Sequence, residues 1–205
     1  MINSKEYWEN FYKDENVTLR PSSFAVFCMK YLDYKESILD FGCGNGRDSI
    51  YFVNQGIYVI AVDWIRNNYL SYLASINKSL KVIWKDIDSA VKDIDTADNL
   101  YMRFFLHAIS DGDQTTILNW ATKATQKKIF IEARSIVEPV GKLISNNIYN
   151  TDHSRRFINK NELEHKLKAI GFDIIHSEES KGLSKQGNSN PVLIRLVAQR
   201  HTNLQ

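Results

Sequence analysis

The chain has 205 residues, of which 43% are hydrophobic and 24% are charged. These values are ordinary for a globular protein with one substantial core, and the length argues against two full domains. Its 26 Lys and Arg residues against 24 Asp and Glu give a formal charge of +2, which argues against a large basic surface for nucleic acid. Two cysteines, Cys28 and Cys43, exclude a disulfide framework and a four-cysteine metal site.

The N-terminal sequence is polar and aromatic and lacks the apolar core of a signal peptide. No apolar run is long enough to cross a membrane. We therefore expect a cytoplasmic protein without a membrane partner.

Two short helices are expected before the first strand. The first contains four aromatic residues, Tyr7, Trp8, Phe11 and Tyr12, which either pack on the sheet or cover a ligand. The second begins after Pro21, with Ser22 or Ser23 as its N-cap.

A glycine-rich turn follows the first expected strand, residues 37–41. This strand contains Asp40, and Gly42, Gly44 and Gly46 follow it before a helix at 46–55. Glycine lacks a Cβ, so backbone N–H groups in such a loop can approach a nucleotide-like ligand closely. The dinucleotide-binding fingerprint requires a third glycine five residues after the first, and Arg47 occupies that position. A pyrophosphate ligand is therefore disfavoured.

Acidic residues follow the next two expected strands. Asp63 ends the strand at 57–62, where a nucleoside-binding βαβ unit places a carboxylate on the ribose hydroxyls, and Trp64 comes directly after it. Asp86 and Ile87 follow the strand at 81–85. An acid in the position of Asp86 is also a common turn or helix-capping residue, so the sequence leaves both roles open.

Strands and helices alternate through the middle of the chain. Further strands are expected at 99–105 and 128–133, with helices at 65–77, 87–95 and 112–126. This alternation predicts an α/β fold with a mostly parallel sheet covered on both faces. An amphipathic helix at 159–170 and two strands at 172–178 and 191–199 then predict a terminal antiparallel hairpin.

The pattern from Asp40 to Gly46, with Asp63 one βα unit later, resembles motif I and the ribose-binding acid of class I S-adenosylmethionine (SAM)-dependent methyltransferases. The resemblance implies a seven-stranded Rossmann-like sheet and SAM as cofactor. It also implies that Asp86 meets the adenine amino group, that Ile87 covers the ring, and that the N-terminal segment with Trp8 and Tyr12 folds over the cofactor. One domain is expected, comprising lid helices (1–36), a SAM-binding half (37–133) and an acceptor loop, helix and hairpin (134–205).

Basic and histidine side chains follow the fourth and fifth expected strands, at the edge where ligands of doubly wound sheets bind. The fourth strand is followed by His107 and contains Arg103, which faces both cofactor and acceptor; Glu132 and Arg134 end the fifth. A later loop contributes the remaining candidate catalytic residues, His153, Arg155 and Arg156. Arginine forks suit an anionic acceptor, and histidine can act as a base toward a hydroxyl.

These three segments together resemble small methyltransferases of bacterial capsular-polysaccharide gene clusters, related to the tellurite-resistance methyltransferases. The resemblance implies a small-molecule or glycan-precursor acceptor, such as a sugar hydroxyl or a phosphoramidate. Ser154 stands where tyrosine is commoner in the family, so an aromatic acceptor contact there is in doubt.

Other functions remain open at this stage. They are an NAD-dependent oxidoreductase on a Rossmann sheet, a non-catalytic SAM-binding protein, and an RNA-modifying enzyme, which the weak net charge disfavours. The Asn/Asp-Pro-Pro-aromatic motif of amino-methylating nucleic-acid enzymes is absent. No residue spacing indicates a metal site. The sequence does not determine the oligomeric state or the methylated atom.

Overall fold

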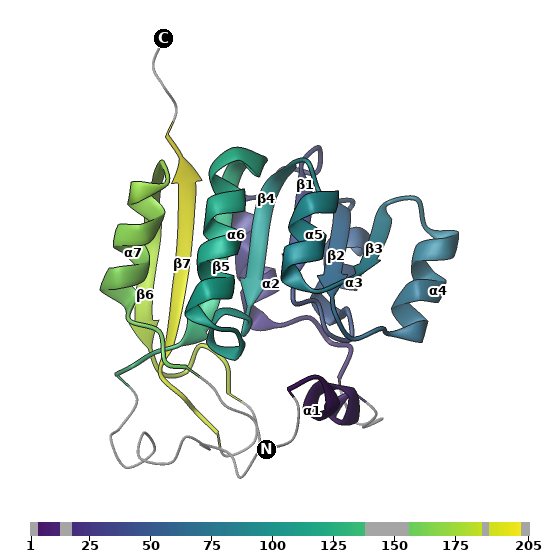
Figure 1. The fold of residues 1–205 in the computed structure, drawn as a ribbon, viewed down its shortest axis with the longest axis horizontal. Helices are drawn as coiled ribbons and strands as arrows, with labels where there is room; N and C mark the ends of the chain where they lie inside the picture. The colour runs from purple at the N-terminus through teal and green to yellow at the C-terminus, as the bar shows by residue number, and fades with distance from the viewer. Residues whose placement is uncertain (1–3, 13–17, 138–155, 186–188, 202–205) are drawn as a thin grey trace.

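A computed structural model describes residues 4–12, 18–137, 156–185 and 189–201. Its seven strands form one sheet in the order β3-β2-β1-β4-β5-β7-β6 (Figure 1). Strands β1 to β5 are parallel, whereas β7 is antiparallel to both β5 and β6. The expected seven-stranded sheet with a terminal antiparallel hairpin is thus confirmed. The strands are β1 (Ser37–Phe41), β2 (Tyr58–Asp63), β3 (Leu80–Trp84), β4 (Ala97–Arg103), β5 (Thr125–Arg134), β6 (Phe172–Ser180) and β7 (Leu193–Arg200).

Helices cover both faces of the sheet because alternate residues of its central strands are apolar on either side. One core joins residues of β1, β2 and β4 to apolar side chains of α2, α3 and α4. The other core lies between the opposite face and α5, α6 and α7. The helices are α1 (Ser4–Phe11), α2 (Ser23–Cys28), α3 (Arg47–Asn54), α4 (Asn68–Ile76), α5 (Ile87–Asp93), α6 (Asp111–Ala124) and α7 (Lys160–Ala169), with 3₁₀ turns η1 (Met29–Tyr31) and η2 (Leu106–Ala108).

The elements begin and end within three residues of their expected bounds. The early end of β4 has a structural cause. We expected this strand to reach residue 105, but it ends at Arg103. Phe104 has a φ of +54°, which is incompatible with extended backbone, and its N–H still donates to the carbonyl of Glu132 at 2.8 Å. The chain turns at this residue into η2, which contains His107.

The N-terminal segment is anchored at Ser22. Its hydroxyl accepts the N–H of Ala25 at 3.0 Å and so makes Ser22, rather than Ser23, the N-cap of α2. The preceding helix α1 lies beyond the edge at which the parallel strands end (Figure 1). In the ranges that the structure describes, no helix combines the length and apolarity needed to cross a bilayer.

Candidate active site

A cavity of about 1020 Å³ lies at the carboxyl ends of the parallel strands. Strands β1, β2, β4 and β5 each contribute a polar side chain from their last residues to its wall. Eleven of the sequence-predicted residues line it: Trp8, Tyr12, Asp40, Gly42, Asp63, Trp64, Asp86, Ile87, Arg103, His107 and Arg134. Residues predicted from distant parts of the sequence therefore meet in one place.

The glycine loop, residues 42–46, begins the floor of this cavity. The N–H groups of Gly42 and Cys43 both donate to the carbonyl of Val62, at 2.8 and 3.0 Å, which ties the loop to the end of β2. Gly44 and Gly46 have positive φ values of 57° and 77°, which L side chains rarely adopt. A Cβ on Gly44 would lie 2.3 Å from the hydroxyl of Tyr12, so only glycine lets the loop approach its cover.

Asp63 is held by the backbone in a fixed orientation. Its Oδ2 accepts the N–H of Gly44 and its Oδ1 accepts the N–H of Ile65, both at 2.9 Å. Burial raises the pKa of this carboxyl above its usual value, while the backbone N–H groups lower it. Each oxygen keeps a second lone pair, so the carboxylate can still accept hydrogen bonds from ligand hydroxyls.

Asp40 is more deeply buried than Asp63. Only 3% of the residue is exposed, and its Oδ2 accepts the hydroxyl of Ser49 at 2.5 Å. Burial raises the pKa of Asp40 to about 7, although the Ser49 hydrogen bond opposes the shift. Asp40 therefore changes charge near neutral pH, and its hydrogen bond with Ser49 joins β1 to α3, the elements on either side of the glycine loop.

Asp86 caps a helix, one of the two roles that the sequence left open, and its place in the cavity wall is compatible with the other. Its Oδ1 accepts the N–H of Ser89 at 2.8 Å and caps α5, and this hydrogen bond is the first cause of its lowered pKa. The side chain also lines the cavity beside Ile87. Asp86 thus lies at the cavity wall with its carboxylate oriented by Ser89.

Aromatic residues of the N-terminal segment form a cover over the cavity. Trp8 stacks on Tyr12 with ring centroids 5.9 Å apart, Tyr7 stacks on Phe11 at 6.3 Å, and all four side chains line the cavity. Burial raises the pKa of Tyr12, and the charge of Asp63 raises it further, so Tyr12 stays neutral. The cluster therefore packs on itself and also encloses the ligand space.

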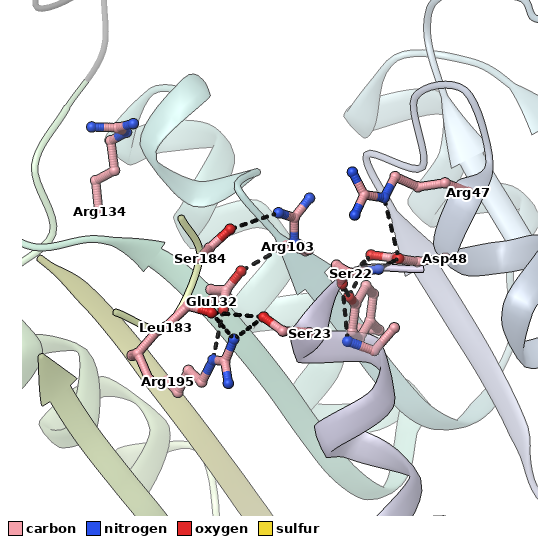
Figure 2. A network of polar contacts seen from close by, with 12 residues as sticks. Ser22, Ser23, Arg47, Asp48, Arg103, Glu132, Arg134, Leu183, Ser184 and Arg195 are labelled. Atoms are coloured by element: carbon pink, nitrogen blue, oxygen red, sulfur yellow. Dashed lines mark hydrogen bonds and ion pairs between the residues drawn. The ribbon is translucent and has the colours of Figure 1, made fainter. Parts of the chain in front are cut away.

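An ion-pair network stands behind Arg103 (Figure 2). Glu132 is fully buried, and its Oε1 accepts Nε of Arg103 at 3.1 Å while its Oε2 accepts Nε of Arg195 at 2.6 Å. Arg195 also donates to Ser23 and to the carbonyl of Leu183. Glu132 comes from the end of β5, at the ligand edge, but it is absent from the cavity wall and orients Arg103 from behind.

His107 is 3% exposed, and its Nδ1 accepts the N–H of Arg134 at 3.3 Å. In the neutral ring this contact leaves the proton on Nε2. His107 in that form donates a hydrogen bond through Nε2 but cannot accept a proton there. The geometry favours a donor role over the base that we expected.

The guanidinium of Arg156 contacts other residues of the protein, whereas we expected it to face the acceptor. Its guanidinium donates to the carbonyls of Ile109 and Leu106 at 2.6 and 2.7 Å and to Gln114 at 2.9 Å. It is not part of the cavity wall, and its catalytic role stays a prediction. His153 and Arg155 lie outside the described residues.

Sequence reasoning missed two arginines. Arg47 lines the cavity, and its position directly after Gly46 was a signal that we used only to exclude a pyrophosphate. Arg195 is contributed by β7, and nothing in its local sequence distinguishes it from a solvent-facing strand residue.

Comparison with known proteins places the chain in a family. The family model described as "Tellurite resistance protein TehB" matches residues 2–109. No curated protein matches the chain.

Several solved structures share the fold. The 1,6-didemethyltoxoflavin-N1-methyltransferase of Burkholderia thailandensis, solved with 1,6-didemethyltoxoflavin and S-adenosylhomocysteine, is 19% identical with a TM-score of 0.71, over 97% of this chain and 84% of that one. The magnesium protoporphyrin IX methyltransferase of Synechocystis PCC 6803, solved with bound SAH, is 11% identical with a TM-score of 0.67, covering 98% and 89%. TehB from Haemophilus influenzae is 16% identical with a TM-score of 0.67, covering 97% and 68%.

The family match extends over more than half of the chain and includes the glycine loop, Asp63 and Asp86. The chain belongs to the TehB family and is a class I SAM-dependent methyltransferase.

Proposed function

We propose that this methyltransferase acts on a small acceptor that is anionic or sugar-linked. The observation that supports this most directly is the set of three arginines, Arg47, Arg103 and Arg134, on the wall of one cavity. Guanidinium groups pair with carboxylate and phosphate oxygens through parallel hydrogen bonds. Arginines gathered at one site therefore favour an oxyanion over a neutral apolar acceptor.

The cavity residues fit the cofactor. Asp63 would hold the ribose hydroxyls, the glycine loop would face the amino-acid end, and Asp86 and Ile87 would contact the adenine. The support comes from the Asp63 carboxylate, which backbone N–H groups hold in a fixed orientation, and from Gly44, where a Cβ would collide with the Tyr12 hydroxyl that covers the loop. The bound cofactor supplies a methyl group attached to a sulfonium.

The chain's own contribution is alignment and exclusion of water. Tyr7, Trp8, Phe11 and Tyr12 cover the cavity, while Arg103 is held in place by Glu132. Fixing two reactants in a productive geometry removes roughly 7–11 kcal/mol of barrier. Rigid placement of Arg103 would orient an anionic acceptor in this way.

The charge balance behind the cavity supports an anionic acceptor. Arg103 and Arg195 share the single carboxylate of Glu132, which leaves one positive charge in excess in the buried group. An oxyanion is already a nucleophile, so it needs cationic contacts more than a base. The donor form of His107 is consistent with that requirement.

Acceptors of this kind include phosphorylated sugars and the phosphoramidate groups of capsular-polysaccharide precursors. Two of the structural neighbours are methyltransferases named for small molecules, 1,6-didemethyltoxoflavin and magnesium protoporphyrin IX. The size of the enclosed cavity supports an acceptor of comparable scale.

The test has two parts. Calorimetric titration should show SAM binding at sub-millimolar concentration, and Asp63→Ala should weaken it about 10- to 100-fold, because two hydrogen bonds to a charged group are lost. Asp95→Ala, which removes an exposed carboxylate on the α5–β4 turn, should leave the affinity unchanged. Full affinity in Asp63→Ala would reject the proposed cofactor site.

The acceptor is identified by mass spectrometry. Phosphorylated sugars and glycan precursors are incubated with enzyme and SAM, and a gain of one methyl group marks the acceptor. Turnover confined to neutral, uncharged compounds would contradict an anionic acceptor.

A further inference from the structure

Arg47 and Arg103 come from different elements but reach the same part of the cavity. Arg47 is the first residue of α3, and Arg103 is the last residue of β4. Both line the cavity, and Figure 2 shows their guanidinium groups extending into the same space. Burial lowers the pKa of Arg47, and the positive charge of Arg103 is the next cause of that shift. Two like charges thus face each other across a partly desolvated space.

The carboxylates beside these arginines are already engaged. Asp48 Oδ1 accepts the N–H of Ser22 at 2.7 Å, and its Oδ2 accepts the hydroxyls of Ser22 and Tyr101 at 2.8 and 2.7 Å. Arg47 Nε lies 3.7 Å from Asp48, beyond hydrogen-bond distance. On the other side, Glu132 divides its two oxygens between Arg103 and Arg195.

Arg47 consequently keeps an unused donor. Its Nε is buried and donates no hydrogen bond to any residue in the described ranges. A buried donor of this kind normally has a partner, so the absence points to a group that the protein itself does not supply. Because Nε itself is covered, a single oxyanion between the two guanidinium groups would be held by the exposed part of the Arg47 fork, and it would offset the repulsion of the two charges.

We propose that Arg47 and Arg103 form a binding site for one oxyanion, a carboxylate or a phosphate group. The site rests on the proposed function, because the two chemical sources of such a group in this cavity are the amino-acid carboxylate of the cofactor and an anionic group of the acceptor. Ser184 and Glu132 hold Arg103, at 3.4 and 3.1 Å, so this half of the site is oriented before the ligand enters.

The experiment measures three probes by calorimetry. These are S-adenosylhomocysteine (SAH), 5′-methylthioadenosine, which lacks the amino-acid end, and inorganic phosphate added to the SAH-loaded protein. Arg47→Gln removes both the charge and the paired N–H donors of the guanidinium group, whereas Arg47→Lys keeps only the charge. Lys123→Gln, at an exposed position of α6, is the control for a change in net charge. Thermal unfolding of each variant verifies that it is folded.

We expect Arg47→Gln to lower the affinity for the probe that supplies the oxyanion about 10- to 100-fold, because this variant loses a charged hydrogen bond. Arg47→Lys keeps the charge and should lose less affinity. A loss for SAH but not for methylthioadenosine identifies the cofactor carboxylate. A loss for phosphate with SAH affinity retained identifies the acceptor. Unchanged affinity for all three probes in a folded Arg47→Gln variant overturns the proposal.

This result is separable from that of the proposed function. If the wild-type protein binds neither SAM nor SAH but binds phosphate through Arg47 when phosphate is added to the ligand-free protein, the oxyanion site stands and the cofactor site fails. If Asp63→Ala abolishes SAH binding while Arg47→Gln changes nothing, the cofactor site stands and the oxyanion site fails.

Discussion

The backbone N–H of Gly44 donates to Oδ2 of Asp63 at 2.9 Å, so the loop after β1 and the acid at the end of β2 form one hydrogen-bonded unit. Nineteen residues separate the two in the chain. Parallel pairing of β1 with β2 brings them together, because it sets Phe41 opposite Val62. The backbone conformation of the loop thereby controls the direction of the carboxylate.

Gly44→Ala should impair ligand binding as well as folding. Alanine at a φ of +57° is strained by about 1–2 kcal/mol, and its Cβ would displace the Tyr12 hydroxyl. The matched control is Gly56→Ala, which has a φ of +84° but no atom within 4 Å of the new Cβ. Urea unfolding should give similar losses of stability for both, whereas calorimetry should show weakened SAH binding for Gly44→Ala alone. Equal SAH affinities in the two variants would contradict this.

Asp40 should make the protein less stable as the pH rises toward neutrality. Its pKa is raised from 3.8 to about 7 in the folded state, so between these values the folded form holds a proton that the unfolded form has lost. The free energy of unfolding therefore falls with increasing pH, by about 1.4 kcal/mol per pH unit from this group. The decline should begin near pH 4 and end near pH 7.

Asp40→Asn isolates the effect. Asparagine can accept the Ser49 hydroxyl but cannot ionise. The difference in unfolding free energy between wild type and variant, measured by urea titration from pH 4 to pH 8, should change with the stated slope. A constant difference across this range would show that Asp40 has an ordinary pKa.

Arg195→Met should destabilise the fold strongly. It removes one of two partners from a fully buried carboxylate, which costs about 3–5 kcal/mol in unfolding free energy. The double variant Glu132→Gln with Arg195→Met removes the unpaired negative charge as well and should recover part of the loss. A double variant that is less stable than the single variant would indicate packing, rather than charge, as the main role of Arg195.

Arg156→Ala should reduce stability by about 2–3 kcal/mol without changing cofactor affinity. The substitution removes hydrogen bonds that hold the carbonyls of Leu106 and Ile109, at the two ends of η2. Thermal unfolding measures the first effect and SAH titration the second. A tenfold loss of SAH affinity in a folded variant would return Arg156 to the ligand site.

Most of the fold was accessible from the sequence because its signals are local. Apolar runs of five or six residues ending in Asp or Gly mark β1 and β2, and alternation with helices implies parallel pairing. The end of β4 was mispredicted, since Phe104 adopts a left-handed conformation that its own side chain disfavours and its tertiary setting imposes.

In the candidate site, too, some residues could be assigned from local sequence signals and others could not. Asp63 and the glycines could be assigned because their role depends on backbone geometry at fixed offsets from a strand. The contacts of Glu132 and Arg156 could not be assigned in this way, because whether a side chain faces a cavity or a buried partner depends on residues far away in sequence. For Glu132 that partner is Arg195, 63 positions away.

The sequence by itself determined the order of strands and helices, the glycine loop and the acid that serves it, since each depends on neighbouring residues and on the allowed backbone angles. Only the tertiary structure decided which arginines face the cavity. Every arginine carries the same charge, but the fold places Arg47 and Arg103 on the cavity wall and Arg195 behind it, although Glu132 pairs with both Arg103 and Arg195.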